Sequence, residues 1–212
     1  MISIKKLEDT TMTLKTLGPA EFEHLAIGAC LLGGGGGGPL TGAAPLLDYL
    51  RAQGQPVTLI GVDDLPTGIV ASAVAGIGAP NAATQSSDFT RAPLQAFQCY
   101  ASLLAQAPGA VLPAEVGAMN SLIPAVVAAQ TGLPLVDADS AGRALPTLNL
   151  AAFNLAAPPS PLLLANPPAD GSDSISITLS TPSASQTDSL VRANLTATDD
   201  SGYSLFERER RL

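Results

Sequence analysis

Six consecutive glycines, Gly33–Gly38, separate two segments whose apolar residues repeat with helical spacing. The first segment begins with Pro19 and carries Glu21 and Glu23 in its first turn, which is typical of a helix N-terminus. The second begins near Thr41, an N-cap residue type. The dinucleotide fingerprint and the P-loop both place a strand before their glycines, and the P-loop also needs a lysine that is missing here. The glycine run therefore joins two helices, and both nucleotide-binding motifs are excluded.

After the second helix, apolar runs alternate with segments of helical spacing. The runs predict strands within 55–66, 68–80, 110–117 and 133–143. Helices are predicted over 91–109 and 119–132, the second with Asn120 or Ser121 at its start. This alternation indicates an α/β fold, with a largely parallel sheet, flanking helices and the glycine-rich helix–helix loop at the ligand crevice.

The composition changes along the chain and divides it into three parts. We expect a flexible N-terminal segment over 1–18, an α/β domain over 19–155 and a Pro/Ser-rich extension over 156–212. Within the extension we expect strands over 162–165 and 174–179, a helix over 187–197 and a frayed charged tail, "FERERRL".

Charge and cysteine content limit the partners of the protein. A net charge of −8 leaves no basic surface for nucleic acid or an anionic membrane. The apolar runs are far shorter than the roughly 18 residues of a membrane span, and the N-terminus lacks the apolar core of a signal peptide. The two cysteines form no closely spaced pair, so we expect reduced thiols and a cytoplasmic location.

Polar residues gather where the predicted strands end, which is where open α/β sheets bind ligands. We expect Glu115, Asp137 and Asp139 to be catalytic in a site for a small-molecule substrate. The expected substrate-binding residues are Gly34, Gly35, Gly36, Gly37, Asn120 and Arg143. Two alternatives stay open: the glycines are a simple helix–helix connection, and Arg143 forms a structural ion pair with Asp139 or Glu115.

A divalent metal is expected at Asp137 and Asp139, because side chains at i and i+2 of an extended segment point to one side and can share a cation. Oxygen ligands alone suit Mg²⁺, Mn²⁺ or Ca²⁺ better than Zn²⁺. We expect His24 to be a packed or surface residue, Cys99 a core residue, and Asp63 and Asp64 part of a turn.

Several short motifs occur in a characteristic order: "AIGACLLGGGGGGP", "VDDLP", "GIGAP", "AEVGAMNSL" and "GLPLVDADSAGRALPTL". From Glu21 to Phe153 the chain resembles the N-terminal domain of the S-methyl thiohydantoin desulfurase family, whose members are often encoded beside hydantoinases. The resemblance implies a cytoplasmic enzyme with a metal such as zinc. It would replace the S-methyl group of a five-membered thiohydantoin ring by oxygen and release methanethiol.

The chain departs from the family pattern at Gln85, where members carry Glu, and at Ala118, where they carry Gly. Because the sequence ends at Leu212, we also expect the family's second domain to be absent from this chain. We therefore expect metal-dependent desulfurisation that is incomplete in this chain alone. Either the chain is a truncated or split gene product, or the enzyme needs a partner, with a homo-oligomer or a separate second-domain chain as the expected partners. The alternative is a non-catalytic module for small-molecule binding or regulation that derives from the enzyme.

Overall fold

The computed structural model describes residues 15–78, 88–155, 161–166, 175–180, 183–197 and 201–209. Its strands are β1 (Lys15–Leu17), β2 (Val57–Ile60), β3 (Val70–Gly78), β4 (Ala110–Pro113), β5 (Leu135–Val136), β6 (Leu162–Asn166), β7 (Ile175–Leu179) and β8 (Ser201–Glu209). Its α-helices are α1 (Pro19–Gly33), α2 (Leu40–Gln53), α3 (Ala92–Leu103), α4 (Ile123–Thr131) and α5 (Ala184–Ala197). Short 3-10 turns are η1 (Val62–Asp64), η2 (Leu148–Leu150) and η3 (Ala152–Leu155).

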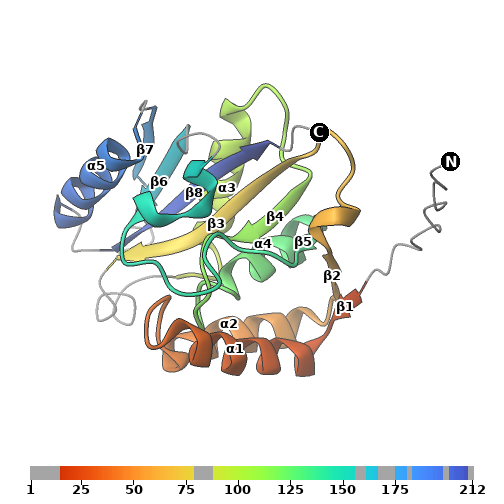
Figure 1. Cartoon of the computed structure of the whole chain (residues 1–212). Helices are drawn as coiled ribbons and strands as arrows, with labels where there is room; N and C mark the ends of the chain where they lie inside the picture. The colour runs from red at the N-terminus through yellow and green to blue at the C-terminus, as the bar shows by residue number, and fades with distance from the viewer. Residues whose placement is uncertain are drawn as a thin grey trace, which may run out of the picture.

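Among these residues the strands form one sheet in the order β1-β2-β5-β4-β3-β8-β6-β7 (Figure 1). Strands β2, β5, β4 and β3 run parallel, and β1 pairs antiparallel with β2. Helix α3 connects β3 to β4, and α4 connects β4 to β5. The predicted α/β class, with a largely parallel sheet and flanking helices, is confirmed. The predicted flexible segment is corrected at Lys15–Leu17, whose backbone pairs with β2; residues 1–14 lie outside the described residues.

The Pro/Ser-rich extension continues the same sheet with antiparallel strands. Both predicted strands and the predicted helix are found, as β6, β7 and α5. The expectation of a frayed tail is wrong for 206–209, because β8 lies between β3 and β6 and pairs antiparallel with β3 from Val70↔Glu209 to Gly78↔Ser201; residues 210–212 lie outside the described residues. This pairing joins segments more than 120 residues apart, so the charged local sequence could not reveal it.

Two apolar cores lie on the two faces of the sheet. On one face α1 to α4 pack over a core that includes Phe22, Leu46, Tyr100 and Ile123. On the other face α5 covers a smaller core that includes Leu162 and Leu164. Strand β3 contributes to both cores, because successive side chains of a strand point to opposite faces of the sheet. Val74 belongs to the first core, and Ala73 and Ala75 belong to the second. From Ile123 to Ala128, helix α4 is apolar on all sides and buried, as expected for a helix between a sheet and further helices.

Helix α4 begins at Ile123, later than Asn120 or Ser121, because residues 117–122 form turns that dock on the glycine run. Asp63 and Asp64 lie in η1, as the predicted turn requires. Cys99 is partly buried against the first core, and His24 is exposed on α1. None of the helices in the described residues is both long enough and apolar enough to cross a membrane.

Candidate functional site

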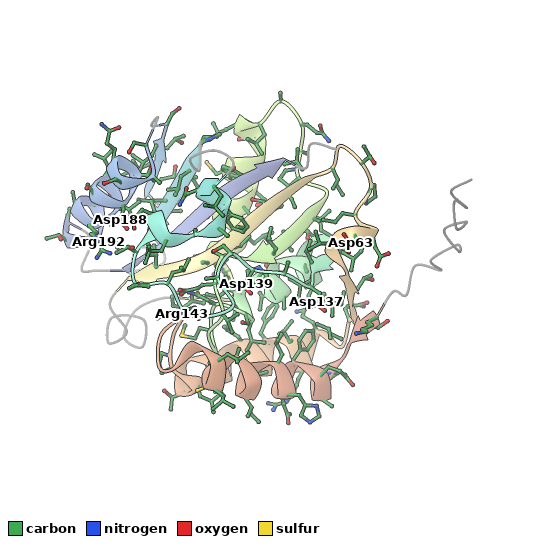
Figure 2. All side chains as sticks on the ribbon, viewed as in Figure 1. Asp63, Asp137, Asp139, Arg143, Asp188 and Arg192 are labelled. Carbon is green, nitrogen blue, oxygen red and sulfur yellow. The ribbon has the colours of Figure 1, made fainter. Side chains whose placement is uncertain are left out.

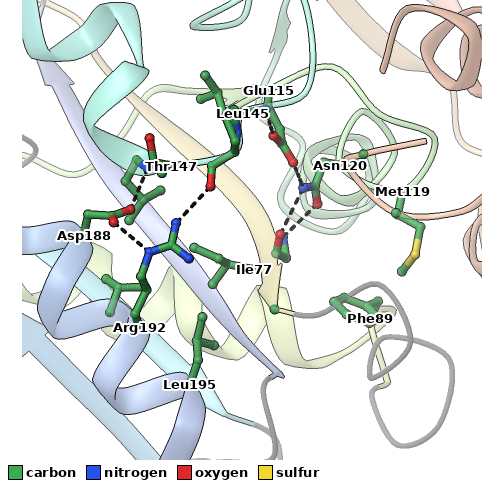
Figure 3. A pocket seen from close by; sticks show the side chains of 18 of the residues that line it. Ile77, Phe89, Glu115, Met119, Asn120, Leu145, Thr147, Asp188, Arg192 and Leu195 are labelled. Atoms are coloured by element: carbon green, nitrogen blue, oxygen red, sulfur yellow. Dashed lines mark hydrogen bonds and ion pairs between the residues drawn. The ribbon is translucent and has the colours of Figure 1, made fainter. Parts of the chain in front are cut away.

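A cavity of about 650 Å³, here called the main cavity, opens at the carboxyl ends of β3 and β4 (Figure 3). This is the edge of an open α/β sheet at which ligands bind. Its walls come from the glycine run, the end of β3, the segments after β4 and β5, and α5. The lining residues include Gly36, Gly37, Gly38, Ile77, Phe89, Glu115, Met119, Asn120, Leu145, Leu148, Asp188, Arg192 and Leu195.

Glu115 follows β4 directly and places a partly buried carboxylate in the wall of the main cavity. One oxygen accepts a hydrogen bond from Asn120 Nδ2 at 2.6 Å, and the other accepts the backbone N–H of Leu145. Burial raises the pKa of Glu115 above its usual 4.5, the negative charge of Asp139 acts in the same direction, and the two hydrogen bonds oppose them. The net direction is upward, and a partly buried carboxyl with a shifted pKa in a cavity wall is a candidate for proton transfer.

Asn120 fixes this carboxylate to the end of β3. Its Oδ1 accepts the N–H of Gly76 at 2.9 Å, and its Nδ2 donates to the carbonyl of Gly76 at 3.0 Å as well as to Glu115. Both amide hydrogens are therefore used within the protein. The geometry gives Asn120 a positioning role, and its expected contact with substrate stays a prediction.

The glycine run crosses the segment after β4 at backbone contact. The Gly37 carbonyl accepts the N–H groups of Met119 at 3.2 Å and Asn120 at 3.1 Å. A Cβ on Gly37, whose φ is +68°, would lie 2.6 Å from the Gly117 Cα, and a Cβ on Gly117 would lie 2.3 Å from the Gly37 Cα. Only glycine at both positions permits this crossing. The run therefore holds Asn120, and through it Glu115, in place.

The predicted glycine contacts divide into two groups. Gly36 and Gly37 line the main cavity together with Gly38, which the sequence did not single out. Gly34 and Gly35 are not among the lining residues, and Gly34 ends α1 in a left-handed conformation. A substrate contact at any of these glycines stays a prediction.

Asp188 and Arg192, on α5, form a part of the cavity wall that sequence reasoning missed. They hold the segment Leu145–Leu148, called the strap below. Arg192 Nη2 donates to the carbonyl of Pro146 at 2.9 Å, and Asp188 accepts the N–H of Leu148 at 2.8 Å and Arg192 Nε at 2.8 Å. In the sequence, the spacing of Asp188 and Arg192 predicts an ion pair on one helix face. Such pairs are common on exposed helix faces, so the spacing does not indicate a functional site.

Asp137, Asp139 and Arg143 follow β5 (Figure 2). None of the three is among the residues that line the main cavity. Asp139 Oδ1 accepts the N–H groups of Ala141 and Gly142, both at 2.6 Å, which closes a local turn. Asp137 is exposed, and β5 ends before it, at Val136. Arg143 is exposed and donates to the carbonyl of Ala144 at 3.2 Å. The structure brings Glu115 and Asn120 together and leaves these three residues outside the cavity.

The described residues do not fit the metal site that the resemblance implies. Nowhere among them do three or more His, Cys, Asp or Glu side chains gather as metal ligands would. The turn after β5 is not extended, since the N–H of Ala138 bonds to the carbonyl of Val136, so the i, i+2 argument for Asp137 and Asp139 fails. Gln85 lies outside the described residues.

Comparisons with known proteins agree with this architecture. A family model described as "S-Me-THD-like, N-terminal domain" matches residues 20–174. The chain is similar to a protein from Chromobacterium violaceum known from an X-ray crystal structure, with 29% identity and a TM-score of 0.78. The match covers 91% of this chain and 54% of that one, so the chain spans about half the length of its structural relative. No protein of curated function matches the sequence.

Proposed function

The chain belongs to the family of S-Me-THD-like N-terminal domains, and from this premise we propose that it binds an S-methyl thiohydantoin ring and contributes the proton-transfer group that removes its methylthio group. The observation that carries the proposal is the partly buried carboxyl of Glu115, whose pKa is raised, in the wall of a cavity at the ligand-binding edge of the sheet. A hydrolysis that releases methanethiol needs such a group.

The main cavity suits a small, mostly apolar ring. Phe89, Met119 and Leu145 provide apolar surface. Polar contacts come from Glu115 on one side and from the Asp188–Arg192 pair on α5. This combination of apolar walls and a few placed polar groups is usual for small-molecule sites. Gly36, Gly37 and Gly38 bring backbone, with no side chain, into the wall of the cavity.

Glu115 accounts for both proton transfers of the proposed reaction. A water molecule adds to the ring carbon that carries sulfur and gives one proton to the Glu115 carboxylate. The carbon–sulfur bond then breaks, and the carboxyl returns that proton to the departing sulfur to form methanethiol. The oxygen stays on the ring carbon as a carbonyl, with the remaining proton on the ring nitrogen. Asn120 and the Leu145 N–H hold the carboxylate in place throughout.

The remaining half of the active site is part of the proposal. Because the structural relative is about twice as long, we propose that a second-domain chain or a second copy closes the main cavity and supplies further contacts. Any divalent metal, zinc included, would take its ligands at least in part from there, since the described residues offer no cluster of three.

The test combines ligand binding with release of methanethiol. We expect the chain as a monomer to bind S-methyl thiohydantoin and to release methanethiol only when the second-domain chain is added or when the chain forms a dimer. Glu115→Gln should lower that release about 10²- to 10⁴-fold, the usual contribution of acid–base catalysis, with little change in affinity. Glu23→Gln, on an exposed glutamate of α1, is the matched control and should keep full release. Full activity of Glu115→Gln, or no binding by the wild type, would overturn the proposal.

One observation favours the alternative, a non-catalytic binding module: the described residues lack a metal-ligand cluster although the family resemblance implies one. This alternative predicts binding of the ring without methanethiol release, with or without the second-domain chain and added zinc. The same assay therefore separates the two functions.

A further inference from the structure

A small apolar side chamber adjoins the main cavity at Glu115. Its volume is about 50 Å³, and six of its lining residues are Ala75, Ile77, Ala114, Leu145, Leu148 and Phe153. It shares Ile77, Leu145 and Leu148 with the main cavity, and Glu115 also lines both spaces. The two spaces are therefore neighbours, and a group attached to a ring in the main cavity would face the side chamber at these residues.

The size of the side chamber selects a group of about two non-hydrogen atoms. One water needs roughly 10–15 Å³ measured in this way, and an apolar cavity of roughly 150 Å³ takes up benzene. At about 50 Å³ the chamber is larger than a single water needs and much smaller than a ring.

The polarity of the chamber wall argues against stable occupation by water. Beside Glu115, its polar side chains are Ser140 and Asn120, and both are committed elsewhere. Ser140 donates its hydroxyl to the Ala114 carbonyl, and Asn120 uses both amide hydrogens. A water needs two to four polar partners, whereas an apolar cavity favours an apolar occupant.

We propose that the side chamber is the leaving-group pocket, which takes the methylthio group while the ring lies in the main cavity; this inference rests on the proposed function. Sulfur and one methyl group match the available volume. Phe153 offers an aromatic ring, with which sulfur makes favourable contacts. Glu115, in the common wall, lies beside the sulfur atom that it must protonate when the carbon–sulfur bond breaks.

This assignment makes Ala114 and Leu148 specificity-determining residues. Ala114 is 6% exposed and small, so its side chain sets the depth of the chamber. Leu148 closes the chamber from the strap. One extra or missing methylene in an apolar pocket changes recognition by about 10- to 200-fold, so S-propyl and even S-ethyl rings should bind much more weakly than the S-methyl ring.

The experiment measures the affinity of the chain for S-methyl, S-ethyl and S-propyl thiohydantoin, with hydantoin as a reference that has no group for the chamber. Ala114→Val should weaken binding of the S-methyl ring at least 10-fold and leave hydantoin binding within about 2-fold. Leu148→Ala enlarges the chamber and should bring S-propyl affinity to within about 3-fold of S-methyl affinity. Leu150→Ala, on an exposed leucine of the same 3-10 turn, is the matched control and should keep the wild-type order.

The outcomes separate the pocket from the proposed function. Equal weakening of S-methyl and hydantoin binding by Ala114→Val, or no preference for S-methyl over S-propyl in the wild type, would overturn the leaving-group pocket and leave the proposed function standing. Should Ala114→Val fail to fold, the Leu148→Ala size series decides alone. Absence of binding for every ring, hydantoin included, would overturn both.

Discussion

The ends of β4 and β5 are neighbours in the sheet, and both strands are followed by carboxylates, yet the two regions differ in nearly every physical respect. After β4, Glu115 is partly buried, accepts two hydrogen bonds from other parts of the chain and lines the main cavity. After β5, Asp137 is exposed and Asp139 closes a turn with residues two and three positions away. Glu115 and Asp139 both follow a strand end, but the hydrogen-bond partners of Glu115 lie five and 30 residues away, whereas those of Asp139 lie two and three residues away.

The difference comes from what packs against each strand end. The segment after β4 lies beneath the glycine run and touches β3 through Asn120, so it cannot turn toward solvent. In the segment after β5, the turn that Asp139 closes has space around it: a Cβ on Gly142, whose φ is +66°, would meet nothing within 4 Å. A carboxylate at a strand end becomes a candidate catalytic group when the surrounding backbone encloses it.

The strongest test of this difference between the two strand ends is to add one methyl group to a glycine in each region. Gly117→Ala should lower the free energy of unfolding by about 3 kcal/mol, because its Cβ would clash with the backbone of Gly37, which cannot move cheaply. Gly142→Ala is the matched control: it strains a left-handed residue in open space and should cost about 1 kcal/mol. Urea denaturation measures both, and equal losses would contradict the backbone crossing.

Sequence reasoning predicted most of the fold because local patterns fix it. Apolar runs of four to nine residues gave the parallel strands, and helical spacing gave α3, α4 and α5. It failed at β1 and β8, whose pairing with β2 and β3 depends on distant partners. The charged sequence "FERERRL" has no local pattern that predicts pairing with β3.

For the site, the sequence identified Glu115, Asn120 and the glycine run, because each belongs to a strand end or to an unusual composition. It could not tell Glu115 from Asp139, since enclosure is a tertiary property. It also missed Arg192 and Asp188, which come from α5, late in the chain, and reach the cavity only through the fold. A helical Asp–Arg pair looks the same on a solvent face and in a cavity wall.

A second way to sharpen the contrast is the pH dependence of stability. The raised pKa of Glu115 means that the folded state binds this proton more tightly than the unfolded chain. Its stabilising effect is therefore complete below the usual value of 4.5 and is lost as pH rises through the folded-state pKa. Each unit by which the pKa is raised corresponds to about 1.4 kcal/mol. Urea denaturation at a series of pH values from below 4.5 upward measures the free energy of unfolding of the wild type and of Glu115→Gln. The loss due to Glu115 should occur in the wild type and not in the variant, and an equal pH dependence of the two proteins would contradict this prediction.

The smallest effects on stability and affinity are expected at Asp137 and Asp139, which the sequence predicted to be catalytic. In Asp139→Asn the amide oxygen still accepts the N–H groups of Ala141 and Gly142, so the free energy of unfolding should change by less than about 0.5 kcal/mol. Asp137→Asn changes an exposed side chain and should be equally mild. Neither variant should alter affinity for the ring by more than about 2-fold, because neither residue lines the main cavity.

The two variants should differ in one measurable property, the pH at which Glu115 titrates. The charge of Asp139 contributes to the raised pKa of Glu115, so Asp139→Asn should move the titration of Glu115 to lower pH. Asp137 is not among the causes of the raised pKa, so Asp137→Asn should leave the titration of Glu115 unchanged. Carboxyl NMR signals followed across pH would show this, with Asp137→Asn as the matched control. A tenfold loss of ring affinity or of bound metal in either variant would instead return these aspartates to the site, because Asn can replace the turn contacts of an aspartate but not its charge at a cation.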